Sequence, residues 1–196
     1  MMLAPILARL GRALAARREP EPGPAAGLED FAGLSDHVVI AGYGRVGHTI
    51  ARILEVEETE IVALERNAGV VARERELGVR IYLGDASRPE ILLKAGAAEA
   101  RLFVVTVDDP ADAERIVTGV RQLRADAPIL ARASDSEHAR RLAKAGASFV
   151  IPDAIEAGLQ LAGRALGEYG YTSELIRTRI AGEREAEYQR ANEDGD

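Results

Sequence analysis

A doubly wound α/β domain with a six-stranded parallel sheet is the fold that this 196-residue sequence predicts, and three observations lead to it. Six short segments are almost continuously apolar, as strands buried on both faces are. Segments with apolar residues at helical spacing separate them along the chain. Parallel strands joined by right-handed helical crossovers place helices on both faces of the sheet. A helical C-terminal extension follows.

The expected elements alternate along the chain. Strands are expected at residues 37–41, 61–64, 80–83, 102–107, 128–131 and 148–151. Helices are expected at residues 46–56, 70–77, 90–94, 111–123, 137–144 and 154–166. The pattern S-x-x-E, starting at Ser87 and again at Ser134, predicts two capping boxes, and Asp109 before Pro110 predicts a third helix start. Glycines 78, 96 and 146 stand where helices must end, a position that favours the left-handed conformation.

The sequence divides into four parts: a basic segment 1–18, a linker 19–34, the α/β domain 35–168, and a helical, acidic tail 169–196. The basic segment starts apolar and then carries four arginines without an acid, while alternating prolines mark the linker. This segment is too short to cross a membrane alone. Its pattern matches the cytoplasmic end of a transmembrane helix under the positive-inside rule. An amphipathic or unstructured surface segment is the alternative.

Composition excludes several classes of function. The chain has no Cys, so a disulfide framework, thiolate catalysis and Cys-ligated zinc are excluded. The net charge of −7 gives no support to a nucleic-acid partner. His37, His48 and His138 have neither metal-ligand spacing nor an obvious nucleophile beside them, and we expect structural roles for all three.

The strongest motif is the glycine loop between the first expected strand and the helix after it. It has the form G-x-G-x-x-G and consists of Gly42, Tyr43, Gly44, Arg45, Val46 and Gly47. The first glycine permits a tight turn, the second lets the backbone approach a phosphate, and the third lets the helix pack on the sheet. The N-terminus of that helix attracts an anion. This context predicts a Rossmann-type nucleotide site, with a glycine turn that binds nothing as the alternative.

An acidic residue follows at the end of the second expected strand. Glu65 lies 18 residues beyond Gly47, where a carboxylate accepts hydrogen bonds from ribose hydroxyls. Because a carboxylate repels a 2′-phosphate, the sequence favours NAD(H) or AMP over NADP. Arg66 beside it weakens that preference.

Further polar residues follow the other strands, at the edge where open α/β sheets bind ligands. Asp85 with its neighbour Ala86, and Thr106 with Asp108, are predicted to line the site, as is Arg132. Helix capping is an alternative for Asp108, and a surface ion pair is an alternative for Arg132. We assign Asp109 to helix capping.

No reaction centre accompanies this predicted site. The sequence lacks a G-x-S-x-G elbow and an H-E-x-x-H motif, and it has no second domain to bring a substrate to a nicotinamide. We therefore expect a binding protein, not an enzyme. A small NAD-dependent oxidoreductase or an NAD-binding accessory subunit is the rival interpretation. A stand-alone interaction module without a nucleotide is a third.

The motifs together resemble the RCK/KTN (TrkA-N) domains, most nearly the cytosolic C-terminal regulatory domain of Kef-type potassium/proton antiporters. The resemblance covers about residues 36–168. It rests on the run from His37 to Gly47 and on four later motifs: Gly84-Asp85-Ala86-Ser87-Arg88, Ala95-Gly96-Ala97, Val107-Asp108-Asp109-Pro110 and Ala131-Arg132-Ala133.

The resemblance implies a regulatory domain that binds NAD(H) or AMP, dimerises and gates ion flux through a membrane-embedded antiporter or channel domain. It implies a cytoplasmic location at the inner face of the cell membrane. The three loop glycines, Glu65 and Asp85 match the family's nucleotide positions, and Arg45 matches an arginine near the glutathione site of glutathione-gated members. Residues 152–156 depart from the charged loop of those members, and the helical tail is shorter. Glutathione control is therefore not expected.

The last expected helix, residues 154–166, has apolar residues on two faces with small residues between them. The apolar residues are Ile155, Leu159, Leu161, Ala162 and Leu166. A helix that covers only its own sheet needs one apolar face. The second face, together with the resemblance, predicts a homodimer.

Overall fold

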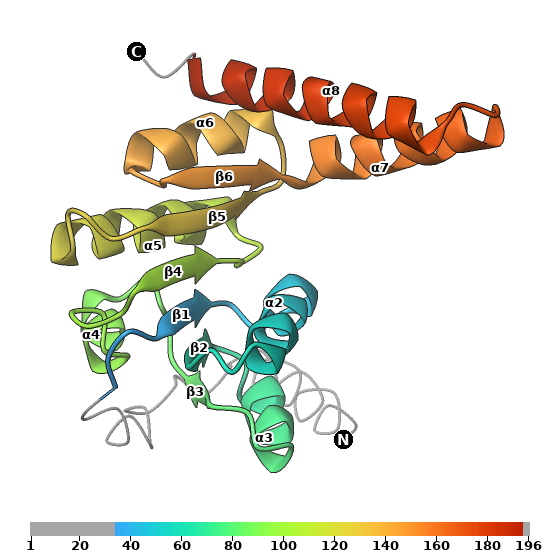
Figure 1. Ribbon diagram of the computed structural model, residues 1–196. Helices are drawn as coiled ribbons and strands as arrows, with labels where there is room; N and C mark the ends of the chain where they lie inside the picture. Colours follow the sequence, from blue (N-terminus) through green and yellow to red (C-terminus); the bar gives the residue numbers. More distant parts are fainter. Residues whose placement is uncertain (1–33, 194–196) are drawn as a thin grey trace, which may run out of the picture.

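The computed structural model describes residues 34–193. Its centre is a parallel sheet of six strands in the order β3-β2-β1-β4-β5-β6 (Figure 1). The strands are β1 (Val38–Ala41), β2 (Ile61–Glu65), β3 (Ile81–Leu83), β4 (Leu102–Val105), β5 (Ile129–Ala133) and β6 (Phe149–Pro152). The predicted basic segment 1–18, and all but the last residue of the linker, lie outside the described residues.

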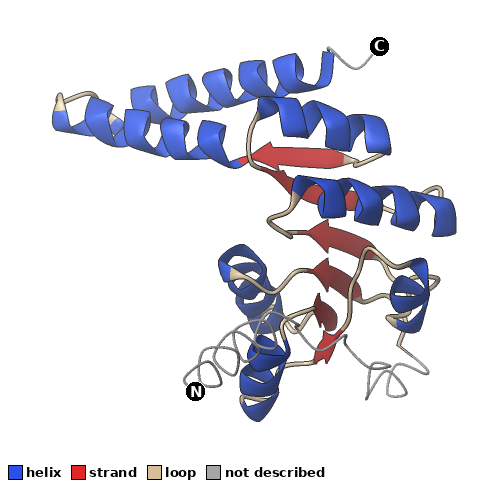
Figure 2. Ribbon diagram, turned by 180° about the vertical axis from the view of Figure 1, so that it is seen from behind, coloured by secondary structure: helices blue, strands red, loops and turns tan. Residues whose placement is uncertain are grey.

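Helices cover both faces of the sheet, so the doubly wound prediction is confirmed (Figure 2). Alternate strand residues point to opposite faces and build two separate apolar clusters. The cluster that contains Val38 and Ile40 packs against α2 (Arg45–Val56) and α3 (Ala68–Glu76). The cluster that contains Val39 and Phe103 packs against α4 (Pro89–Lys94), α5 (Pro110–Leu123) and α6 (Ser136–Ala145).

Helix α7 (Asp153–Glu168) and helix α8 (Ser173–Glu193) form a hairpin, the α7–α8 arm, which projects beyond β6 (Figure 1). The helices approach each other at Gly163, where an added Cβ atom would lie in van der Waals contact with Ile176 and Ile180. Glu156 on α7 accepts hydrogen bonds from Arg184 at 2.7 and 3.0 Å and from the Tyr188 hydroxyl at 2.7 Å. Residues 173–193 of the predicted tail therefore form a helix that packs on α7.

Two predicted helix starts were wrong in detail. Helix α4 has no capping box, because Arg88 is its N-cap residue and the Ser87 hydroxyl instead donates to Asp85 Oδ1 at 2.7 Å. Helix α6 is capped one residue later than predicted. The carboxylate of Asp135 accepts a hydrogen bond from the His138 amide at 2.8 Å, since a charged oxygen is the stronger acceptor.

Other predicted boundaries are confirmed. Asp109 caps α5 by accepting from the Asp112 amide at 2.9 Å, and this bond lowers the pKa of the Asp109 carboxyl. Gly78, Gly96 and Gly146 have positive φ angles of 85°, 75° and 106°. Within residues 34–193, no helix combines the length and the apolar character needed to cross a lipid bilayer.

Candidate functional site

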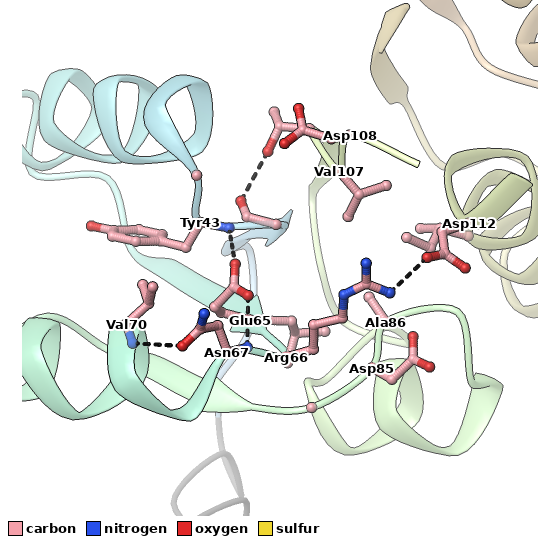
Figure 3. Close-up of a pocket in the computed structure, with 16 residues that line it drawn as sticks. Tyr43, Glu65, Arg66, Asn67, Val70, Asp85, Ala86, Val107, Asp108 and Asp112 are labelled. Carbon is pink, nitrogen blue, oxygen red and sulfur yellow. Dashed lines mark hydrogen bonds and ion pairs between the residues drawn. The ribbon is translucent and has the colours of Figure 1, made fainter. Parts of the chain in front are cut away.

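A cavity of about 250 Å³ opens at the carboxyl edge of the sheet, where β1 has β2 on one side and β4 on the other (Figure 3). This is the point where the strand order reverses, the usual ligand position in open α/β sheets. Nine of the residues predicted from the sequence line it: Gly42, Tyr43, Gly44, Glu65, Arg66, Asp85, Ala86, Thr106 and Asp108.

The glycine loop has the close contacts that its motif predicts. Gly42 has a φ of +96°. A Cβ atom on Gly47 would overlap the carbonyl oxygen of Gly42 and would lie 2.9 Å from the Thr106 hydroxyl. That hydroxyl donates to the Gly42 carbonyl at 2.8 Å, so β4 holds the loop from the other side. At Gly44 a Cβ would meet nothing within 4 Å, so the backbone there faces open space.

The N-terminus of α2 points its unpaired backbone amides toward this open space. Gly44 is the N-cap residue and supplies no side-chain cap, and the first turn contains no acid. Arg45 adds a positive charge at the first helical position. Free amides, the helix dipole and a cation together suit a phosphate group.

Glu65 ties the end of β2 to the glycine loop. One carboxylate oxygen accepts from the Tyr43 amide at 2.9 Å, and the other accepts from the Asn67 amide at 2.8 Å. A carboxylate has about four lone-pair positions, so each oxygen keeps capacity for a ribose hydroxyl. Burial, followed by the charges of Glu55 and Glu74, raises the pKa of Tyr43 to about 12, and its ring points away from the cavity (Figure 3).

The remaining charged residues of the cavity are already paired. Asp85 Oδ1 accepts from the Ser87 amide at 2.9 Å, in addition to the hydroxyl bond described above. Arg66 donates to Asp112 at 2.9 Å, from the loop after β2 to the first turn of α5. The sequence analysis missed Asp112 because nothing near it in sequence points to the site.

Six further lining residues were also missed: Leu64, Asn67, Val70, Gly84, Val107 and Ile116. Asn67 had a recognisable signal, because asparagine is a preferred N-cap residue and it stands three residues before the start of the expected helix 70–77. Its side chain accepts from the amides of Gly69 and Val70 and starts α3.

A second cavity of about 470 Å³ adjoins the first and shares Gly44, Thr106 and Asp108 with it. Three more of the predicted site residues line this second cavity: Arg45, Val46 and Arg132. Gly47 lines neither cavity, and its role is to let α2 pack closely on the glycine loop. Arg132 donates to Asp153 at 2.6 Å and also to Asp108. The hydrogen bond with Asp108 is the main cause that raises the pKa of Arg132. The ion pair considered from the sequence is therefore present.

The histidines line neither cavity. His37 is buried and contacts the Ala95 carbonyl at 3.0 Å, and His138 is buried beside Ser134. Burial is the main cause that lowers the pKa of His138. In the described part of the chain, no group of three or more His, Asp or Glu side chains is arranged to hold a metal ion.

A glycine loop, a carboxylate at the end of β2 and a cavity at the switch point together define a domain with a Rossmann-type site. The model of the TrkA-N domain family matches residues 38–153. The chain belongs to this family, and its resemblance to Kef-type regulatory domains is confirmed.

Curated relatives are potassium antiporters of much greater length. The chain is 37% identical over 134 residues to a protein of Alkalimonas amylolytica whose name describes it as a K⁺ efflux antiporter, KefB. The match covers 68% of this chain and 20% of that protein. It is also 37% identical over 146 residues to the chloroplastic K⁺ efflux antiporter 1 of Arabidopsis thaliana. That match covers 74% of this chain and 12% of the antiporter. The chain thus spans a fifth or less of these relatives.

Two solved structures share the fold. The Kef C-terminal domain of Shewanella denitrificans in its AMP-bound form is 26% identical, with a TM-score of 0.71, covering 80% of this chain and 96% of that chain. The GsuK channel bound to NAD is 22% identical, with a TM-score of 0.63. The match covers 80% of this chain and 28% of the channel chain. The second likeness concerns the fold alone.

The two loop glycines should respond differently to substitution. We expect Gly47→Ala to lower the free energy of unfolding by about 1–3 kcal/mol, because the added methyl group overlaps the Gly42 carbonyl. Gly44→Ala should cost less than about 1 kcal/mol, the difference between two N-cap residues. Urea unfolding followed by circular dichroism measures both values, and equal losses would contradict the packing role of Gly47.

Proposed function

We propose that this chain is a regulatory domain that binds NAD(H) or AMP and thereby controls a membrane-embedded K⁺/H⁺ antiporter or cation channel. One observation carries the proposal: the open backbone at Gly44 and the carboxylate of Glu65 line the same cavity. The first suits a phosphate and the second suits a ribose. The AMP-bound Kef domain supports the choice of an adenine nucleotide.

The rest of the cavity fits an adenosine moiety. Val70 and Ile116 give it apolar walls, and Asp85 with Ala86 lies across from the glycine loop. The 5′-phosphate would lie at the N-terminus of α2, beside Arg45, in the part of the site that Glu65 and Asp85 do not line. The adjoining second cavity gives room for the second half of a dinucleotide.

We further propose that the domain is not an enzyme. General acid or base catalysis needs a titratable group within reach of the substrate. Here Glu65 accepts from two backbone amides, Arg66 is bound to Asp112, and Asp85 is bound to Ser87. In the second cavity Arg132 is held between two carboxylates. These engaged groups favour a ligand sensor over the rival oxidoreductase.

A physical connection leads from the cavity to the α7–α8 arm. Asp108 lines both cavities, and its partner Arg132 also binds Asp153, the first residue of α7. A ligand that displaces Asp108 therefore changes the hydrogen bonding at the start of the arm.

We also propose that the arm mediates a homodimer. Of the α7 residues only Leu159 is buried, and Leu161 is 73% exposed. Phe149 and Ile151 on the neighbouring strand β6 are 42% and 40% exposed. These exposed apolar side chains are candidates for the contact surface of the dimer.

The proposed ligand can be tested by calorimetry with AMP, NAD and NADH. We expect binding by the natural chain, and we expect Glu65→Ala to weaken it by about 1–3 kcal/mol, the worth of a charged hydrogen bond. Glu76→Ala is the matched control, because it removes an exposed glutamate of α3 outside the cavity. Equal affinity of the wild type and Glu65→Ala would overturn the ribose assignment.

Light scattering tests the dimer. The natural chain should have the mass of a dimer, and Leu161→Glu should lower it toward the monomer by placing a charge in the apolar surface. Leu77→Glu, at an equally exposed leucine beyond α3, is the control and should stay dimeric. A monomer at high concentration, with and without NAD, would exclude the dimer.

The membrane partner has a genomic test. If the domain regulates a transporter at the inner face of the membrane, the neighbouring coding sequence or a longer form of the chain should contain many apolar spans. Deletion of residues 1–24 would then uncouple the domain from its partner. A context without any transporter, fused or adjacent, would overturn the transport proposal and leave the nucleotide proposal standing.

A further inference from the structure

We infer that Asp112 makes the site selective for nucleotides with a free 2′-hydroxyl, because it holds Arg66 back from a 2′-phosphate. The inference rests on the proposed nucleotide site and adds its selectivity. In Rossmann domains an acid at the end of β2 binds the ribose hydroxyls, whereas a nearby arginine accommodates a 2′-phosphate. Here the acid and the arginine stand side by side, as Glu65 and Arg66.

The structure shows how the arginine is engaged. Arg66 Nη1 lies 2.9 Å from Asp112 Oδ2, a contact between residues 46 positions apart that spans the cavity (Figure 3). The Asp112 side chain is only 13% exposed, whereas that of Arg66 is 66% exposed. The carboxylate is therefore the fixed partner, and the long arginine side chain is the one that it restrains.

Asp112 is itself held firmly in place. Its other carboxylate oxygen binds Arg115 one turn later on α5, and its backbone amide donates to Asp109 at 2.9 Å. One carboxylate thus engages two guanidinium groups at the rim of the cavity. Removing it would release Arg66, the one of the two that lines the cavity beside Glu65.

The balance of charge in the cavity points the same way. Four of its lining residues are acids, Glu65, Asp85, Asp108 and Asp112, against one cation, Arg66. A phosphate monoester carries about −1.5 to −2 charges at pH 7. While Asp112 is bound to Arg66, a 2′-phosphate meets the negative carboxylate of Glu65, whereas a 2′-hydroxyl meets the same carboxylate as a hydrogen-bond acceptor.

The test compares two probes that differ only in the 2′-phosphate, AMP and adenosine 2′,5′-bisphosphate, by calorimetry on the full chain. The wild type should prefer AMP. Asp112→Ala should shift the ratio of the two Kd values toward the bisphosphate by about tenfold. Asp112→Asn keeps the side-chain shape and should shift the ratio in the same direction. Asp126→Ala, which removes an exposed acid next to Arg124, should leave the ratio unchanged.

A double variant tests whether Arg66 carries the effect. In the Arg66→Ala/Asp112→Ala variant most of the shift should disappear, since the released guanidinium is gone. An unchanged ratio in both Asp112 variants, with AMP still bound, would overturn this inference and leave the proposed function intact. A wild type that binds neither probe would overturn the proposed site, and with it this inference.

Discussion

The close approach of α2 to the end of β1 is the constraint on which the site depends. Only a glycine at position 47 lets the first turn of the helix lie against the Gly42 carbonyl. That contact fixes where the helix starts and aims its free amides at the carboxyl edge of the sheet. Thr106, the first residue after β4, donates its hydroxyl to the same carbonyl, so β1 and the end of β4 are joined at one peptide group. The cavity lies at that meeting point.

Charge is distributed around this point in a way that orients a ligand. The chain carries a net charge of −7, yet the start of α2 has no acid in its first turn and begins with Arg45. Glu65 and Asp85, at the ends of β2 and β3, line only the first cavity, whereas Asp108 after β4 lines both cavities. A ligand with one anionic end and one hydroxyl-bearing end therefore has one favourable direction. Electrostatics then gives orientation at a site that a glycine loop alone would leave ambiguous.

The sequence predicted all six strands to within two residues, because buried parallel strands are short, continuous apolar runs. Strand β4 ends at Val105, two residues early, since Thr106 and Val107 turn to line the cavity. The glycine loop and Glu65 could be found because their spacing is local. Asp112 could not, because its partner lies 46 residues away and only the fold brings the two together. The helical tail was predicted, but the packing of Ile176 and Ile180 of α8 on α7 was not, because it depends on the turn between the two helices.

Arg132 shows why the pairing of charged groups matters more here than their number. Its guanidinium is shared between Asp108, at the rim of both cavities, and Asp153, where α7 begins. A planar guanidinium has fixed donor directions, so moving one partner changes the geometry offered to the other. A ligand shifts an equilibrium only as far as it interacts differently with the two states. Asp108 is where such a difference can arise, because it faces the cavity and is 88% exposed, whereas Arg132 is 24% exposed. The exposed acid lies at the cavity, and the less exposed cation on β5 connects it to the first residue of the arm.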